Sequence, residues 1–263
     1  MSTSANLLTD HPELYEAQFP DPDRRAGRWA EHVLRRHGAG ARVLDAGCGT
    51  GRDIAYLHAQ GRDTVAIDVS ETMLAYARTH HPGPEYHRAD LRGFDLGRTV
   101  DAVLCLDSSL LYCHTNDELA GFLGSCRRHL AEGGLLVAEF RNGAYFLGAT
   151  DGLGVPRTRS VTWQGVAHTS TTTLHIDRAA QLLRRRRVWT TTGTERHPVE
   201  QHSAWRLLFP QELRHLLAHA GFEVLELHDG PGPRTEPPWR PGAHEPVGGA
   251  DGDRLHLVAR LTS

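Results

Sequence analysis

Short apolar runs alternate with amphipathic segments between residues 42 and 140, and this alternation constrains the fold more than any other feature. The apolar runs lie at 42–46, 64–69, 85–89, 101–106 and 135–140. Amphipathic helices are predicted between them, at 52–60, 71–80 and 116–130. Strands this short and apolar are covered on both faces, so the pattern predicts an α/β fold with a parallel sheet and helices on both sides.

Caps support the predicted helix bounds. Ser70 is a plausible N-cap for the helix 71–80, and Thr115 with Glu118 is typical of a capping box before the helix 116–130. The pair Gly133-Gly134 is expected to end that helix. A further helix is predicted at 22–37, where alanine, tryptophan, valine and leucine side chains share one face.

The pattern changes after residue 142. Residues 168–176, 182–192 and 201–208 are rich in Thr, Val, Trp and Arg and lack a helical period. They predict two or three antiparallel strands. A helix is then expected to begin at Pro210 and to stop at Gly221.

The chain is expected to close with a pair of strands, at 222–228 and 255–261. The intervening segment, 230–253, is too rich in Pro and Gly for regular structure. It is interpreted either as a disordered excursion or as an ordered loop at the mouth of a site.

The first apolar run leads into VLDAGCGTGRD, residues 43–53, where three glycines stand at alternate positions. A glycine turn between a strand and a helix brings free backbone amides close to a nucleotide-like ligand. A triphosphate loop requires Lys followed by Ser or Thr, whereas this loop continues with Arg52. Arg52 also stands where a dinucleotide loop has its third glycine, and Asp45 would repel a pyrophosphate. The loop therefore favours a nucleoside that carries an amino acid.

Composition excludes several other chemistries. All 29 residues in the Lys+Arg count are Arg, so the chain has no Schiff-base lysine and no phosphate-binding P-loop lysine. The net charge of −3 implies no general affinity for polyanions. The four cysteines lack CxxC spacing and are typical of reduced thiols. We expect a cytoplasmic protein with no signal peptide and no membrane span.

Carboxylates follow three successive predicted strands. Asp45 lies in the approach to the glycine loop, and Asp68 ends the second strand, where a carboxylate can accept both ribose hydroxyls. Asp90 follows the third strand and can accept from an adenine amine. This ordered set describes S-adenosylmethionine, whereas the alternative interpretation is that loop acids cap helices.

These residues resemble the class I S-adenosylmethionine-dependent methyltransferases. VLDAGCGTG, AIDVS and ADLR are similar to the first three motifs of that family, and FDLGRTVDAVLCLDSSLLY to its fourth-strand region. The resemblance implies a Rossmann-like, seven-stranded, mostly parallel sheet whose sixth and seventh strands form an antiparallel edge. It implies S-adenosylmethionine as cofactor and S-adenosylhomocysteine as product.

The resemblance also implies four regions. Residues 1–40 would form an N-terminal helical cap over the cofactor and 41–145 the cofactor-binding α/β core. Residues 155–209 would form an antiparallel β lid inserted into the core. Residues 210–263 would add the helix and strand pair that complete the sheet.

Cofactor contacts are expected at the motifs and at the segment ELYEAQF near the N-terminus, which resembles the aromatic segment that closes over the cofactor. The expected residues are Tyr15, Asp45, Ala46, Gly47, Gly49, Gly51, Asp68, Val69, Met73, Asp90, Leu91, Leu106 and Ser108.

The antiparallel insertion resembles the small-molecule branch of the family, which includes N,N-dimethyltransferases of amino sugars and peptide N-terminal methyltransferases. Enzymes that methylate base amines carry an Asn/Asp-Pro-Pro-aromatic motif after the fourth strand, whereas this chain has DSSL. The Pro-Cys nucleophile of cytosine enzymes and the two-glutamate loop of arginine methyltransferases are absent too.

Methyl transfer from a sulfonium needs positioning, and a base only to remove a proton from the acceptor. Tyr112 and His114 are the catalytic candidates, on the loop after the fourth strand. In the amino-sugar enzymes this loop resembles one that carries a histidine near Tyr112. The alternative for His114 is a surface histidine ahead of a capped helix.

Four residues are expected to bind the acceptor: Phe19, Arg141, His202 and Trp205. Arg141 can clamp a carboxylate or form a structural ion pair with Glu139 or another acid. Trp205 can form a wall for the acceptor or pack in a core.

The arginine run and the histidine content bear on two other kinds of partner, nucleic acid and metal. The run RRRR at 184–187 invites a nucleic-acid interpretation, but alternate side chains in a strand point to opposite faces, so we expect no basic stripe and no nucleic-acid partner. Although the chain has 18 histidines, no HxH or HxxxH pair lies near a carboxylate in a coherent segment, so no metal is expected.

The sequence therefore predicts methyl transfer from S-adenosylmethionine to a small molecule of specialised metabolism. An amine nitrogen is the first choice of acceptor, and carbon or oxygen stay open. The alternatives are a nicotinamide oxidoreductase, an RNA or protein methyltransferase, and a non-catalytic regulatory protein that binds S-adenosylmethionine. The general base and the choice between monomer and homodimer are left open.

Overall fold

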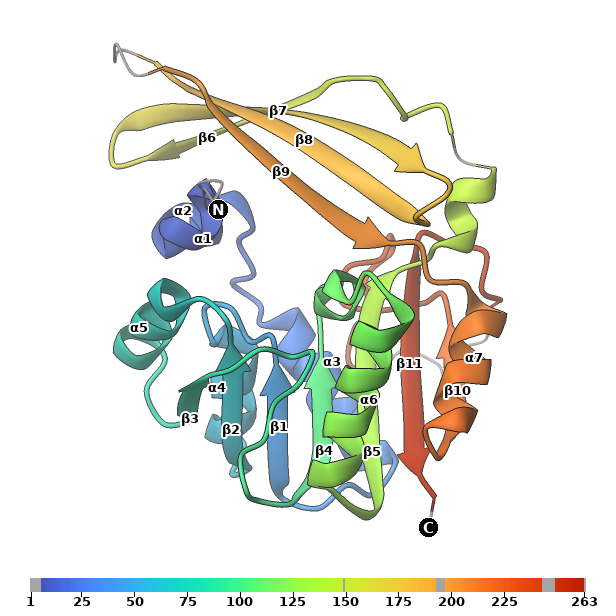
Figure 1. Cartoon of the computed structure of the whole chain (residues 1–263). Helices are drawn as coiled ribbons and strands as arrows, with labels where there is room; N and C mark the ends of the chain where they lie inside the picture. Colours follow the sequence, from blue (N-terminus) through green and yellow to red (C-terminus); the bar gives the residue numbers. More distant parts are fainter. Residues whose placement is uncertain (1–5, 149, 193–196, 243–248, 263) are drawn as a thin grey trace.

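A computed structural model describes residues 6–148, 150–192, 197–242 and 249–262. In this part of the chain, a seven-stranded sheet with helices on both faces is joined to a separate four-stranded sheet that lies over one end of it (Figure 1). The expected α/β class and the expected antiparallel insertion are therefore confirmed. Residues 1–5 of the predicted cap and 243–248 of the Pro- and Gly-rich segment lie outside the described residues.

The large sheet has the strand order β10-β11-β5-β4-β1-β2-β3. Its five parallel strands are β1 (Arg42–Ala46), β2 (Asp63–Asp68), β3 (Glu85–Arg88), β4 (Val100–Cys105) and β5 (Leu130–Arg141). The antiparallel edge consists of β10 (Phe222–His228) and β11 (Arg254–Leu261). The strand order reverses next to β1, so the ends of β1, β2 and β4 open onto one crevice, where ligands of open α/β sheets bind.

Helices cover the two faces of this sheet as two separate apolar clusters. One cluster contains side chains of α3 (Arg25–Arg36), α4 (Arg52–Ala59) and α5 (Glu71–His80). The other contains side chains of α6 (Asn116–His129) and α7 (Pro210–His219). Alternate residues of β1 divide between the clusters, because successive side chains of a strand point to opposite faces.

The predicted caps are present. Ser70 accepts a hydrogen bond from the Met73 amide, and Thr115 with Glu118 forms a complete capping box. The expected role of Gly133-Gly134 is wrong, because α6 already ends at His129 and the glycine pair lies within β5. The pairing of β4 with β5 shifts register there, and two glycines tolerate that irregularity.

The smaller sheet, called the lid here, has the antiparallel order β6-β7-β8-β9. Its strands are β6 (Arg157–Trp163), β7 (Val166–Asp177), β8 (Leu182–Thr191) and β9 (Val199–Arg206). The strand β6 was not predicted, because it is an edge strand with no buried residue and therefore has no apolar run.

Two short helices, α1 (Leu7–Asp10) and α2 (Pro12–Gln18), lie under the lid (Figure 1). Leu8 and Leu14 pack with Trp189 of the lid in one apolar cluster. The helix α3 was expected to belong to the same N-terminal cap, but it packs on the large sheet. Two 3-10 helices, η1 (Ser109–Tyr112) and η2 (Ala144–Leu147), follow β4 and β5.

The described part of the segment 230–253 folds back over the core. The Asn142 amide group donates to the carbonyl oxygens of Ala250 and Gly252, at 2.7 and 2.9 Å. Trp239 is buried in the cluster that contains α3. Of the two interpretations of this segment, the described residues therefore follow the ordered one. No helix among the described residues is both long enough and apolar enough to pass through a lipid bilayer.

Candidate functional site

A cavity of about 380 Å³ lies between the strand ends of the large sheet and the lid. This volume falls within the range of small-molecule sites. The structure brings together, as lining residues, most of the predicted site: Tyr15, Phe19, Asp45, Gly47, Gly49, Asp68, Met73, Leu106, Ser108, Tyr112, Arg141 and Trp205.

The glycine loop is built so that its backbone approaches the cavity closely. Gly47 and Gly51 have φ of 87° and 77°, in the left-handed region that favours glycine. A Cβ on Gly47 would lie 2.8 Å from Ser109, and one on Gly51 would lie 2.7 Å from the Tyr86 hydroxyl. Gly51 faces away from the cavity and instead allows the sharp turn into α4.

Asp68 organises this loop from the end of β2. Its two carboxylate oxygens accept hydrogen bonds from the amides of Gly49 and Ser70, each at 2.9 Å. Burial raises the pKa of Asp68, although these amide hydrogen bonds oppose the shift. The carboxylate therefore holds the loop and also faces the cavity.

Asp45 is 3% exposed at the end of β1. Among the described residues, its carboxylate accepts no side-chain or backbone hydrogen bond and forms no ion pair. Burial, and then the nearby charges of Asp53 and Asp68, raise its pKa well above the usual value. A ligand that supplies a cation or a donor here would offset this unfavourable burial, as expected for an ammonium group.

A buried charge network lies behind these carboxylates. Glu139 is fully buried at the end of β5 and pairs with Arg234 and Arg254, each at 2.7 Å. Burial alone would raise its pKa, but the two guanidinium groups lower it to about 2. Arg234 also reaches Asp107 at 3.3 Å. The network thus holds Arg234, which comes from the segment 230–253, at the cavity wall.

The N-terminal helices close one side of the cavity through polar contacts. Glu16 accepts hydrogen bonds from Thr50 and Arg52 of the glycine loop and α4. Arg52 also donates to the carbonyl oxygen of Phe19, at 2.7 Å. The Tyr15 hydroxyl donates to Asp107 at 3.3 Å. These hydrogen bonds hold the segment that carries Tyr15 against the glycine loop that it covers.

Tyr112 and His114, the two catalytic candidates, have different places. Tyr112 is the last residue of η1 and lines the cavity. His114 does not line it, because its Nε2 donates to the Ala204 carbonyl oxygen of the lid at 2.9 Å. His114 therefore connects the core with the lid, and its selection as a catalytic residue is not supported by its position.

His202 was expected at the cavity with Trp205, and this placement is wrong. In β9, Gln201 and Trp205 line the cavity, whereas His202 points to the opposite face and pairs with Glu200 at 2.7 Å. Residues three apart in a strand point to opposite faces, so His202 and Trp205 cannot both face the site.

Arg141 lines the cavity and does not pair with Glu139. Its guanidinium group lies 3.6 Å from Asp253 and 5.4 Å from the centre of the Trp205 ring. Of the two alternatives for this residue, the structure has an ion pair with another acid, made at the cavity wall.

Five of the expected cofactor contacts do not line the cavity, and Gly51, which faces away from it, is one of them. Ala46 is fully buried, and Val69 is 60% exposed beyond β2. Asp90 and Leu91 follow β3, where Arg92 donates to Asp90 and thereby lowers its pKa. The Ala89 amide donates a hydrogen bond to the Asp68 carbonyl oxygen, and Asp68 lines the cavity. The segment after β3 that contains Asp90 and Leu91 therefore lies beside the cavity.

Sequence reasoning missed several residues of the cavity. Asp107 follows the fourth strand and lies between the predicted residues Leu106 and Ser108, so the rule that selected its neighbours could have found it. Strand alternation could have placed two of the four arginines at 184–187 in the site. Arg234 carries no such signal, because it comes from an irregular segment. The described residues contain no group of three or more His, Cys, Asp or Glu side chains that could hold a metal ion.

Comparison with known proteins agrees with this architecture. Residues 43–134 match a methyltransferase-domain family. Over 134 residues the chain is 34% identical to dTDP-3-amino-3,4,6-trideoxy-alpha-D-glucopyranose N,N-dimethyltransferase of Streptomyces venezuelae, which covers 49% of this chain. The chain spans only about half of that relative, 56% of its length.

Solved structures extend the likeness to the whole chain. A sugar N-methyltransferase from Streptoalloteichus sp. has a TM-score of 0.77 and 26% identity, over 100% of this chain and 97% of its own. An amino pentose methyltransferase from Micromonospora echinaspora, solved with S-adenosylmethionine bound, has a TM-score of 0.70 and 25% identity, over 96% of both chains.

The chain thus has the fold of the Rossmann-like, S-adenosylmethionine-dependent methyltransferases, and the resemblance noted from its motifs is confirmed. Residues 43–134 match the methyltransferase-domain family, and within the class the chain is similar to sugar N-methyltransferases.

Proposed function

We propose that this chain transfers a methyl group from S-adenosylmethionine to the amine nitrogen of a small molecule of specialised metabolism, of the amino-sugar type, and releases S-adenosylhomocysteine. The observation that carries the proposal is the buried, donor-free carboxylate of Asp45 beside the loop-organising carboxylate of Asp68 in one lidded cavity. The sugar N-methyltransferases to which the chain is similar support the choice of acceptor.

The residues of the cavity fit the cofactor. Asp45 would accept from its ammonium group, and Asp68 from its ribose hydroxyls. When bound, S-adenosylmethionine supplies a methyl group on a sulfonium, which leaves as a neutral thioether. The glycine loop would admit the cofactor backbone closely, because Gly47 has no Cβ to fill the space. We assign the other predicted cofactor residues that line the cavity on the same grounds: Tyr15, Gly49, Met73, Leu106 and Ser108. For Ala46, Gly51, Val69, Asp90 and Leu91 the cofactor contact remains a prediction.

The chain's own contribution to the reaction is to position the acceptor and to exclude water. The lid and the helices α1 and α2 cover the cavity together, since they pack in one apolar cluster. Tyr112 reaches the cavity from η1 with a hydroxyl group that makes no hydrogen bond to the described residues. It would accept a hydrogen bond from the acceptor amine and aim the nitrogen lone pair at the methyl group.

The four regions predicted from the sequence would divide this work. The segment 1–40 contributes the cover through α1 and α2, 41–145 the cofactor site, 155–209 the lid, and 210–263 the sheet edge and Arg234. A cytoplasmic location and the lack of a nucleic-acid partner remain predictions. The second is supported by the arginines at 184–187, which divide between two faces of the lid.

The test is methyl transfer from isotope-labelled S-adenosylmethionine to a pooled panel of amino sugars, other amines, phenols and carboxylates, with products read by mass. Wild type would be compared with Asp68→Ala and with Asp117→Ala, an exposed aspartate on α6. We expect label on an amine with wild type and Asp117→Ala, and at least a hundredfold less with Asp68→Ala, because the loop loses two amide contacts and the ribose its acceptor.

Label on a carbon or hydroxyl group would correct the acceptor chemistry but keep the class. Calorimetric binding of S-adenosylmethionine without transfer to any pool would favour a regulatory protein. Failure of wild type to bind S-adenosylmethionine would refute the proposal.

A further inference from the structure

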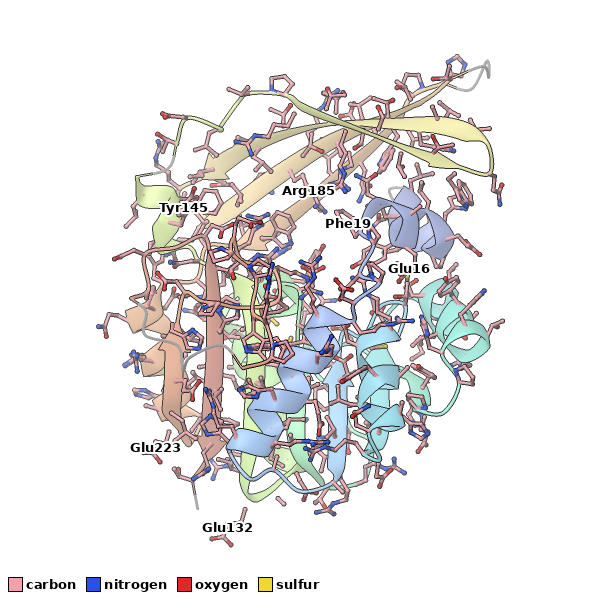
Figure 2. The ribbon with its side chains drawn as sticks, turned by 180° about the vertical axis from the view of Figure 1, so that it is seen from behind. Glu16, Phe19, Glu132, Tyr145, Arg185 and Glu223 are labelled. Carbon is pink, nitrogen blue, oxygen red and sulfur yellow. The ribbon has the colours of Figure 1, made fainter. Side chains whose placement is uncertain are left out.

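The four arginines of β8 are divided by strand alternation into an outer and an inner pair. On the outer face, Arg184 pairs with Asp177 at 2.7 Å and Arg186 with Glu200 at 2.6 Å. On the inner face, Arg185 and Arg187 line the cavity. Figure 2 shows Arg185 under the lid, on the side of the large sheet.

The inner pair has no carboxylate partner within ion-pair distance in the described part of the chain. Arg185 donates to the Ser203 hydroxyl at 2.8 Å, and its guanidinium group lies 4.4 Å from the centre of the Trp205 ring. Arg187 is 7% exposed and donates through Nε to Thr172 at 3.0 Å. One terminal nitrogen of Arg187 is buried and has no hydrogen-bond partner.

The positive charge of Arg187 is buried, which is unfavourable without a counterion. Burial, and then the positive charge of Arg185, lower the pKa of Arg187 to about 10. Arg187 therefore stays protonated, although a buried charge destabilises a protein unless it is paired. An anion bound between the two side chains would remove this penalty.

The cavity is polarised as a consequence. Its core wall carries four carboxylates, Asp45, Asp53, Asp68 and Asp107, and four arginines that each pair with an acid, Arg52, Arg141, Arg234 and Arg254. Its lid wall carries Arg185 and Arg187, which pair with no acid among the described residues. The carboxylates at the strand ends suit the cationic cofactor. The unpaired arginines lie on the lid side of the same cavity, which leaves them for the acceptor.

We propose that Arg185 and Arg187 bind an oxyanion, a carboxylate or a phosphate group, carried by the methyl acceptor. This inference rests on the proposed function for the identity of the acceptor site. The guanidinium groups can form charge-assisted hydrogen bonds with such a group, and the paired geometry favours an acceptor with two or more oxygens. The acceptor would then be an amine that also bears an anionic group.

Calorimetry with simple anions tests the site without requiring methyl transfer. Inorganic pyrophosphate and malonate would be titrated into the full chain, with and without S-adenosylhomocysteine. The variants are R185Q/R187Q and the control R184Q/R186Q, which removes the same charge from the outer face of the same strand. We expect the inner variant to weaken binding of the preferred anion by about tenfold or more, and the outer variant by less than about twofold.

The choice of anion distinguishes the two sources: pyrophosphate models a phosphate ester and malonate a carboxylic acid. Glucosamine, glucosamine-6-phosphate and 2-amino-2-deoxygluconate would then be compared as acceptors. If no amine is methylated although anion binding depends on Arg185 and Arg187, the proposed function fails and the anion site stands.

Three results would overturn the inference. Wild type could bind neither anion, or the outer variant could lose as much affinity as the inner one. The inner variant could also lose affinity for S-adenosylmethionine itself, which would assign the anion to the cofactor's carboxylate. Far-UV circular dichroism would establish that the double variants fold, and the single variant Arg185→Gln, at a half-buried position, repeats the test if R185Q/R187Q does not.

Discussion

At the scale of single residues, the cavity depends on a few buried charges whose partners come from distant parts of the chain. Glu139 supports the loop after β4 from within: its carboxylate and carbonyl oxygen accept from the amides of Asp107 and Ser108. Both of those residues have positive φ, 48° and 68°, which non-glycine residues rarely adopt. The conformation that turns Asp107 into the cavity therefore depends on Glu139.

Replacing Glu139 tests this dependence. We expect Glu139→Ala to lower the free energy of unfolding by about 3–5 kcal/mol, because Arg234 and Arg254 would be left buried without their partner. Urea denaturation measures the change. The control is Glu200→Ala, which breaks the exposed pair with Arg186 and should cost no more than about 1 kcal/mol. Equal losses in the two variants would contradict the argument.

Replacing Arg187 is expected to stabilise the fold, whereas replacing Glu139 is expected to destabilise it. The buried charge of Arg187 has no carboxylate within ion-pair distance among the described residues, so Arg187→Met should raise the free energy of unfolding by about 1 kcal/mol. For a chain of this size, that corresponds to a midpoint about 2–4 °C higher in thermal denaturation. Arg186→Met, on the outer face, should not stabilise. A midpoint for Arg187→Met at or below that of Arg186→Met would argue against an unpaired buried charge.

At the scale of elements, the position of α2 decides whether the cavity is covered. This helix is short, and isolated helices of this length are not stable in water. It is held by the lid through Leu14 and by the glycine loop through Glu16. In Figure 2, Glu16 and Phe19 lie between the lid and the core. The order of α2 should therefore depend on Glu16.

The variant Glu16→Ala removes the contacts with Thr50 and Arg52. We expect faster amide hydrogen exchange in α2 and about tenfold weaker binding of S-adenosylmethionine, because hydrogen bonds to charged groups contribute about 1.5–3 kcal/mol. Exchange followed by mass spectrometry, with calorimetry, measures both. Glu13→Ala, at an exposed position of the same helix, is the matched control. Unchanged exchange in Glu16→Ala would show that the lid alone holds α2.

At the scale of the whole molecule, the buried acids couple cofactor binding to pH. The pKa of Asp45 is raised in the folded chain, first by burial. A carboxyl group with a raised folded pKa stabilises the fold fully below its unfolded pKa of about 4, and this stabilisation is lost as pH rises through the folded value. Ionisation of Asp45 therefore lowers the stability of the folded chain, and a bound cationic ligand would offset this loss.

The increase in thermal unfolding midpoint caused by saturating S-adenosylmethionine should accordingly be larger at pH 7 than at pH 5. In Asp45→Asn this difference should shrink, because the group no longer ionises. Glu139 does not contribute to it, since its pKa of about 2 lies below the range. Differential scanning calorimetry at both values measures the effect, and an unaltered pH dependence in Asp45→Asn would exclude Asp45 as its source.

The sequence by itself determined the local features of this protein. The predicted helix 71–80 and the strands 42–46 and 222–228 have the bounds that the structure shows, and the glycine loop and Asp68 lie at the predicted strand ends. These features depend on periodicity, caps and turn residues within a few positions of each other. Such short-range preferences can be read directly from a single sequence.

Only the tertiary structure decided which side chains share the cavity. His202 and Trp205 are close in sequence but face opposite ways, because a strand's phase is set by what its neighbours bury. Arg234 and Glu139 meet across 95 positions. Contacts of this kind depend on packing between residues that are far apart in the sequence. The set of charges in the site is therefore determined by how the lid, the N-terminal helices and the C-terminal segment pack around the cavity.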